Sequence, residues 1–112
     1  MSFLSTHVLD VTGGRPAEGV EVELLAVTPE GEQSLARGST DTDGRVTALG
    51  PDALPGGDYR LRFAVGTYFD RHGLRTLFPT IAIDFLVTEG ESAHLHLPVL
   101  VSPYAYSTYR GS

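Results

Sequence analysis

The chain has 112 residues and a mass of 12.0 kDa, which fits one domain spanning residues 1–112. Hydrophobic residues make up 41% of it and charged residues 20%, a balance typical of a folded protein and not of a disordered or membrane-embedded one. The formal net charge of −6 counts against a nucleic-acid partner, because phosphate contacts need a basic patch. Without cysteine there is no disulfide, thiolate nucleophile or cysteine-bound zinc. The first residues show no signal peptide or membrane span, so we expect the protein in the cytoplasm.

Alternating apolar and polar residues predict short strands along most of the chain. Such alternation, with one apolar and one wetter face, is typical of half-buried strands in an antiparallel sheet. Glycine and proline are frequent, with 13 and 7 residues, and they separate the alternating runs by turns. Seven or eight strands at this spacing indicate an all-β sandwich or barrel, and one short helix is expected at residues 67–72. The clearest strands are expected at residues 19–27, 59–65, 80–87 and 94–102.

The last of these strands carries two histidines on one face. The opposite face is purely aliphatic and consists of Leu95, Leu97, Val99 and Val101. If the aliphatic face packs in the core, His94 and His96 point outward together with Pro98 and Leu100. That outward face is partly apolar, so a second subunit could cover it and enclose a pocket lined by imidazole.

Histidine titrates near neutral pH and suits general acid–base catalysis, although a single one is most often a hydrogen-bonded structural residue. His94 and His96 could also bind a metal with His7 as a third ligand, but no cysteine completes such a zinc site. The segment Asp-Thr-Asp-Gly at 41–44 begins like a calcium loop, yet Arg45 stands at the next ligand position, so we interpret it as an Asp-Gly turn. The sequence has no Gly-x-Ser-x-Gly motif for a serine nucleophile.

Three blocks of the sequence carry a more specific pattern. The first is residues 5–20, which begins Ser-Thr-His-Val-Leu-Asp, and the second is Thr-Asp-Gly-Arg at 42–45. The third joins the His-x-His strand to Ser-Pro-Tyr at 102–104 and Tyr-Arg-Gly-Ser at 109–112. In this pattern the chain resembles the transthyretin-related 5-hydroxyisourate hydrolases over nearly its whole length. In that family the Tyr-Arg-Gly-Ser ending separates the hydrolases from transthyretin, the hormone carrier, which lacks it.

The resemblance implies a transthyretin-like β-sandwich of two four-stranded antiparallel sheets with one short α-helix. It also implies a homotetramer, a dimer of dimers, whose active sites lie in the channel between the dimers. The implied reaction is hydrolysis of 5-hydroxyisourate to 2-oxo-4-hydroxy-4-carboxy-5-ureidoimidazoline in urate degradation, by water attack on a cyclic amide without metal or organic cofactor. The chain departs from the family at Leu95 and Val101, where hydrolases commonly have an aromatic residue and a leucine. Both are expected on the core face.

The resemblance further implies which residues form the site. Its catalytic set is His7, Arg45, His96 and Ser112, and its substrate-binding set is His7, Arg45, Tyr109 and Ser112. We expect one histidine to activate water and the other to assist, with His7 assigned first and the two roles exchangeable. Arg45, which is always protonated, would hold substrate oxygens and stabilise the developing oxyanion. Ser112 would orient water or substrate through its hydroxyl or its terminal carboxylate, and Tyr109 would donate a hydrogen bond.

Two histidines and two other classes of function stay open. His94 is expected to support the site indirectly, and His72 is expected at the surface. A transthyretin-like carrier that binds a small ligand in the same channel is the alternative function, although the ionisable residues and the Tyr-Arg-Gly-Ser ending count against it. The third possibility is a structural or metal-binding sandwich with His94 and His96 as ligands.

Overall fold

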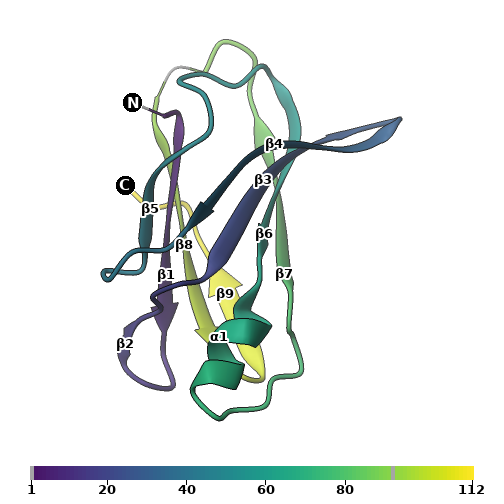
Figure 1. The fold of residues 1–112 in the computed structure, drawn as a ribbon. Helices are drawn as coiled ribbons and strands as arrows, with labels where there is room; N and C mark the ends of the chain where they lie inside the picture. The colour runs from purple at the N-terminus through teal and green to yellow at the C-terminus, as the bar shows by residue number, and fades with distance from the viewer. Residues whose placement is uncertain (1, 92) are drawn as a thin grey trace.

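The alternating segments form strands that stack as two β-sheets, with one short helix at an end of the sandwich, which confirms the predicted architecture (Figure 1). The computed structural model describes residues 2–91 and 93–112. Each of the four predicted strands is present, shifted by at most two residues at either end. In chain order the elements are β1 Leu4–Asp10, β2 Arg15–Pro16, β3 Glu21–Thr28, β4 Gly31–Ser39, β5 Arg45–Leu49, β6 Gly57–Phe63, α1 Val65–Arg71, β7 Ile81–Val87, β8 Leu95–Ser102 and β9 Ala105–Thr108.

The two sheets differ in how their strands pair. One has the order β4-β3-β6-β7, and every neighbouring pair in it is antiparallel, as predicted. The other has the order β2-β1-β8-β9, with β5 also paired to β1, so it has five strands in the described chain, one of them only two residues long. In this sheet β1 and β8 run parallel, which corrects the prediction of two four-stranded antiparallel sheets. Alternation shows which face a strand buries but not its direction, and the chain between β1 and β8 provides the crossover that parallel neighbours need.

The core lies between the inner faces of the sheets, where the alternation places the apolar side chains. Leu95 and Val101, the two departures from the family pattern, are 7% and 0% exposed, so both pack inside as predicted. In β6, Tyr59, Leu61 and Phe63 are all buried on the inner side. The outward positions of the same strands are therefore available for polar groups.

The helix α1 (Val65–Arg71) begins two residues before the predicted segment 67–72. Val65, Tyr68 and Phe69 lie on one side of it at helical spacing and are buried, so that side packs against the core. No helix in the described part of the chain is long and apolar enough to cross a membrane.

Candidate active site

Three neighbouring strands, β5, β1 and β8, bring the histidines and the arginine of interest to one outer face. His7 on β1 lies opposite Arg45 on β5, and Ser5 on β1 lies opposite His96 on β8. Side chains alternate along a strand and cross-strand partners share a face, so all four point the same way. The intervening Thr6 is fully buried, which makes the shared face the outer one.

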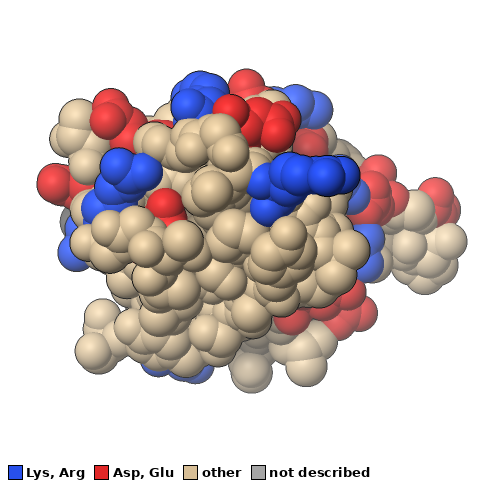
Figure 2. Space-filling model, turned by 90° about the horizontal axis from the view of Figure 1, so that it is seen from below, with Lys and Arg blue, Asp and Glu red and all other residues tan. Residues whose placement is uncertain are grey.

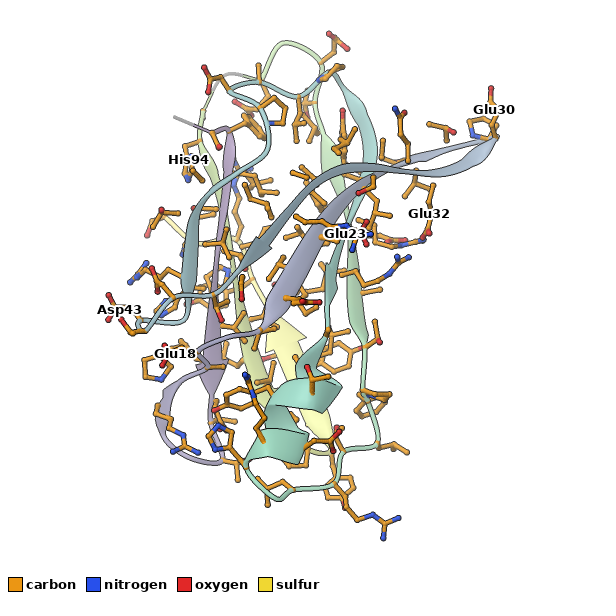
Figure 3. All side chains as sticks on the ribbon, viewed as in Figure 1. Glu18, Glu23, Glu30, Glu32, Asp43 and His94 are labelled. Atoms are coloured by element: carbon orange, nitrogen blue, oxygen red, sulfur yellow. The ribbon has the colours of Figure 1, made fainter. Side chains whose placement is uncertain are left out.

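A pocket with a volume of about 540 Å³ opens on this outer face. In Figure 3, His94 lies near the upper end of the face, and Asp43 lies lower, in the turn before β5. His94 also lines the pocket. The structure thus brings together every residue predicted for the site, since the pocket is lined by His7, Arg45, His96, Tyr109 and Ser112.

Ser5 joins two histidines beneath the pocket. Its Oγ lies 2.7 Å from His94 Nε2 and 2.8 Å from His96 Nδ1. His94 Nδ1 lies 3.1 Å from the carbonyl oxygen of Ser2. Ser5 is only 8% exposed, so water has little access to this junction. The His96 ring is therefore held through Nδ1, whereas its Nε2 forms no hydrogen bond with any residue that the structure describes.

The predicted Asp-Gly turn holds Arg45 and His7 in place. Asp41 Oδ1 accepts hydrogen bonds from the backbone N–H groups of Asp43 and Arg45, both at 2.9 Å. The Asp43 carbonyl oxygen accepts a hydrogen bond from His7 Nε2 at 2.8 Å. Gly44 has a φ of 76°, and a Cβ there would lie 2.4 Å from a backbone oxygen of β1, so the turn packs against β1 only with glycine at this position.

The C-terminal segment reaches the pocket by packing against His96. β9 is an edge strand beside β8, and the segment that follows it returns to the site. The Gly111 N–H donates to the His96 carbonyl oxygen at 2.8 Å. A Cβ at Gly111 would lie 2.6 Å from His96 Cδ2, so only glycine allows this approach. Gly111 belongs to the terminal Tyr-Arg-Gly-Ser motif, and no role is predicted for it from the sequence.

His96 is electrostatically distinct from an exposed histidine. Partial burial holds its pKa below the ordinary histidine value, because desolvation disfavours the charged ring. Electrostatic interactions with Arg45, His7 and His94 lower this pKa further, and a hydrogen bond to the backbone of Ser5 acts in the opposite direction. At neutral pH His96 is therefore a neutral imidazole, which is the form that accepts a proton.

The two remaining histidines differ in their distance from the pocket. His94 lies at the pocket, where a supporting residue is expected. His72 lies far from it at the end of α1, is exposed as predicted, and accepts a hydrogen bond from Arg15 Nη2 at 2.9 Å. Ser5 and Thr47 also line the pocket and were given no role. Each lies two positions from a predicted site residue, so the alternation was the signal that could have found them.

The metal-binding alternative has His94 and His96 as ligands, with His7 as a possible third. Across residues 2–91 and 93–112, no group of three or more His, Cys, Asp or Glu side chains is arranged to hold a metal ion. Instead, two of these imidazoles share Ser5 and the third bonds the backbone of the Asp-Gly turn.

The chain is similar in sequence and in fold to known proteins. The model of the HIUase/Transthyretin family matches residues 4–111. The 5-hydroxyisourate hydrolase of Salmonella dublin is 46% identical over 112 residues, covering 99% of this chain and 82% of its own. The solved 5-hydroxyisourate hydrolase of Klebsiella pneumoniae superposes with a TM-score of 0.84 at 42% identity, covering 100% of this chain and 94% of its own. Transthyretin from Sparus aurata superposes with a TM-score of 0.91 at 26% identity, covering 99% and 97%.

Proposed function

Since this chain belongs to the HIUase/transthyretin family, we propose that it hydrolyses 5-hydroxyisourate in urate degradation and that the pocket on the outer face of β5, β1 and β8 is its active site. The observation that carries the site is the convergence of His7, Arg45 and His96 with Tyr109 and Ser112 around one pocket. The substrate is supported by the 46% identity with a hydrolase of that activity over almost the whole chain. Opening a cyclic amide needs an activated water, stabilisation of an oxyanion and a proton for the leaving nitrogen.

His96 is the general base of this proposal. Burial lowers its pKa, so it is neutral at working pH, and its Nε2 has no partner among the described residues. A neutral imidazole with a free nitrogen can take a proton from water as the water attacks the substrate carbonyl. Of the two assignments that the sequence left exchangeable, the geometry thus favours the one with His96 as base and His7 as its partner.

His7 then supplies the proton to the leaving nitrogen. Its Nε2 donates to the Asp43 carbonyl oxygen, which can only accept, so the ring is held through Nε2. The other ring nitrogen is then the proton donor toward substrate. Because His7 pairs with Arg45 across β1 and β5, the donor and the guanidinium face the same reacting group.

Arg45 holds the substrate oxygens and stabilises the developing negative charge. Its guanidinium forms no ion pair with any residue the structure describes, so its donors are available to a ligand. The Asp41 hydrogen bonds fix only its backbone. A planar fork of donors that always carries a positive charge suits an amide oxygen that becomes an oxyanion.

The C-terminal segment closes one side of the pocket. Ser112 and Tyr109 both line it, and Gly111 ties the segment to the His96 backbone. The Ser112 hydroxyl orients the attacking water or the substrate, and the Tyr109 hydroxyl donates a hydrogen bond to the substrate.

A small-ligand carrier is the second candidate, since the fold resembles transthyretin as closely as it resembles a hydrolase. The shape of the chain therefore does not separate the two functions. The chemistry of the pocket does favour hydrolysis, because three ionisable groups, His7, Arg45 and His96, line a space of about 540 Å³. A carrier for an apolar ligand would have fewer charged groups in that space.

The working form is a homotetramer, a dimer of dimers, with the pocket in the channel between dimers. The pocket lies on an outer face, where a second copy can close it. Seen from the end that carries α1, most charged side chains lie along the upper and lateral edges of the view and leave a broad uncharged area in its centre (Figure 2). Exposed large apolar side chains accompany the loop after α1 and the segment that includes β9, namely Leu74, Leu77, Tyr104 and Tyr106. Sedimentation equilibrium should give about four times the 12.0 kDa chain mass, and a monomer would reject this assembly.

The cytoplasm is the proposed compartment. A chain without cysteine gains nothing from an oxidising environment, which fits this location. Fractionation of the cells that make the protein tests it.

The decisive test of the function is catalysis itself. Urate oxidase generates 5-hydroxyisourate from urate. The decay of the ultraviolet absorbance of 5-hydroxyisourate is then followed with and without this protein. We expect the decay to accelerate in proportion to enzyme concentration. Decay at the spontaneous rate would reject the hydrolase and favour the carrier.

A further inference from the structure

A continuous set of hydrogen bonds leads from the backbone of Ser2 to the proposed base. His94 Nδ1 lies 3.1 Å from the Ser2 carbonyl oxygen, and His94 Nε2 lies 2.7 Å from Ser5 Oγ. The same Oγ lies 2.8 Å from His96 Nδ1. The proposed mechanism gives Ser5 and His94 no role, although both line the pocket.

The chemistry of each group fixes the direction of these bonds. A carbonyl oxygen only accepts, so His94 must carry a proton on Nδ1 and donate it to Ser2. In the tautomer that has its one ring proton on Nδ1, His94 Nε2 is an acceptor, and the single hydroxyl proton of Ser5 donates to it. With that proton used, Ser5 Oγ can only accept from His96, which therefore carries its proton on Nδ1. The lone pair of His96 is left on Nε2.

We infer that Ser5 and His94 are positioning residues that hold the proton of His96 on Nδ1 and leave Nε2 as the proton acceptor of the active site. The inference rests on the proposed role of His96 as the base. It adds a reason for that role, since a neutral imidazole activates water only through its unprotonated nitrogen. With the proton on the wrong nitrogen, a correctly placed histidine would present a donor where an acceptor is needed.

The surroundings of the His96 ring agree with this orientation. Nδ1 is held at the buried hydroxyl of Ser5, so the ring turns its other nitrogen away from that hydroxyl. Gly111 lies against Cδ2, the carbon bonded to Nε2, where the missing Cβ leaves room beside that edge. Arg45 and His7, the charged and titratable neighbours on β5 and β1, lie on the same outer face.

The strand register fixes the relative positions of Ser5, His94 and His96. Ser5 pairs directly with His96 in the parallel register of β1 and β8, and His94 lies two residues before His96, on the same face. Ser5 is 8% exposed, so water cannot easily replace its hydroxyl. Removing that hydroxyl would leave the proton on His96 Nδ1 without an acceptor, which disfavours that tautomer.

The tautomer can be measured without any catalysis. In protein with ¹⁵N-labelled histidine at neutral pH, long-range proton–nitrogen correlation spectra distinguish protonated from unprotonated ring nitrogens. We expect His96 to show a protonated Nδ1 and an unprotonated Nε2, and His94 to show the same pattern. A wild-type His96 with its proton on Nε2 would overturn the inference, whether or not the chain hydrolyses 5-hydroxyisourate.

Variants of Ser5 supply the kinetic test. We expect Ser5→Ala to lower kcat about 10- to 100-fold, less than the full 10²- to 10⁴-fold contribution of a general base, because part of the population keeps the productive tautomer. KM should change little, and the His96 spectrum should shift toward a protonated Nε2. The conservative variant Ser5→Thr keeps a hydroxyl at the same position and should recover kcat and the wild-type spectrum.

Matched variants elsewhere separate positioning from loss of structure. Ser102→Ala removes a different hydroxyl, from the end of β8, the strand that carries His96. The Ser102 hydroxyl donates to the Ala105 carbonyl oxygen at 3.1 Å, and its loss should leave kcat unchanged. His94→Phe removes the acceptor for Ser5 and should lower kcat as Ser5→Ala does, whereas His72→Phe, a histidine distant from the pocket, should not. Unchanged kcat in folded Ser5→Ala and His94→Phe would overturn the inference. If the wild type fails to accelerate decay, the proposed function fails, while the spectra still decide the tautomer.

Discussion

The two outer faces of the sandwich use polar side chains in opposite ways. On β4, β3, β6 and β7, charges are paired with one another: Arg60 contacts Glu32 and Asp84, while Arg62 contacts Glu32 and Glu23. Glu23 and Glu32 lie on that sheet in Figure 3. On β5, β1 and β8 the polar groups are imidazoles, a serine hydroxyl and an arginine without an ion-pair partner among the described residues.

The contrast shows what makes one face a candidate site. On the paired face, Arg60 lowers the pKa of Asp84, and Arg62 with Arg60 lowers the pKa of Glu32, so both acids stay charged and are already satisfied. On the other face, burial and nearby positive charge lower the pKa of His96, which keeps it neutral and able to accept a proton. Both faces are built on β-sheets, but the charged groups of one face are already paired with one another, whereas the polar groups of the other face are available to a ligand.

Removing the proposed base should have the largest effect. We expect His96→Ala to lose about 10²- to 10⁴-fold in kcat, the range of a general base, while the melting temperature changes little because the ring faces outward. The measurement is the decay of 5-hydroxyisourate followed beside thermal unfolding. A large fall in melting temperature with normal turnover would mean that His96 is structural.

The two arginines allow a direct comparison of the faces. Arg45→Ala should lower kcat about 10²- to 10³-fold, as expected for loss of an oxyanion donor. Arg60→Ala, the matched change on the paired face, should leave kcat unaltered. An equal loss of kcat in both variants would contradict the assignment of the active site to the face of β5, β1 and β8.

Deletion of residues 109–112 tests the contribution of the C-terminal segment. The deletion removes Tyr109, Ser112 and the Gly111 contact with His96, so turnover should fall severely. Assembly and circular dichroism should stay unchanged, because none of these residues belongs to the buried core. Full activity in the folded deletion variant would reject the assigned role of the segment.

Substitution of Gly111 should move the base without removing it. The Cβ of Gly111→Ala would lie 2.6 Å from His96 Cδ2, so the ring must shift, and a misplacement of about 1 Å costs roughly 100-fold in rate. Gly73→Ala is the control, since its Cβ meets nothing but its φ of 70° strains alanine. The control should lose melting temperature and keep activity, the reverse of Gly111→Ala. Normal kinetics in Gly111→Ala would show that the ring has room.

The smallest expected effect is a change in thermal stability at acidic pH, and it concerns the ion pairs on the outer face of β4, β3, β6 and β7. Asp84 and Glu32 have lowered pKa values in the folded state, so their stabilisation is complete above the unfolded value near pH 4 and is lost as the pH falls through the folded one. The melting-temperature advantage of wild type over Arg60→Ala should be modest at neutral pH, because these groups are exposed, and should vanish in acid. A growing advantage in acid would contradict the pairing.

Much of this molecule could be predicted from its sequence. Alternation assigned the faces of Leu95, Val101 and His96 correctly, because side-chain period depends only on local backbone geometry. The family resemblance named five residues that meet at one pocket.

What the sequence left undetermined depends on contacts between distant segments. The parallel pairing of β1 with β8 sets Ser5 beside His96, and no local pattern encodes strand direction. The role of Gly111 depends on a 2.6 Å approach that exists only in the folded chain. Which histidine is the base likewise depends on burial and neighbouring charge, and both appear only in three dimensions.

The pH dependence of kcat/KM in the wild type, corrected for spontaneous decay, tests the central claim most directly, because it reports groups that ionise in the free enzyme. His96 must be neutral to accept the proton, and its pKa is lowered in the folded chain. We expect kcat/KM to rise with pH on an acidic limb that lies below about pH 6.5, the ordinary histidine value, and the limb to disappear in His96→Ala. A limb above that value, or one that survives in His96→Ala, would contradict a neutral His96 as the base of this active site.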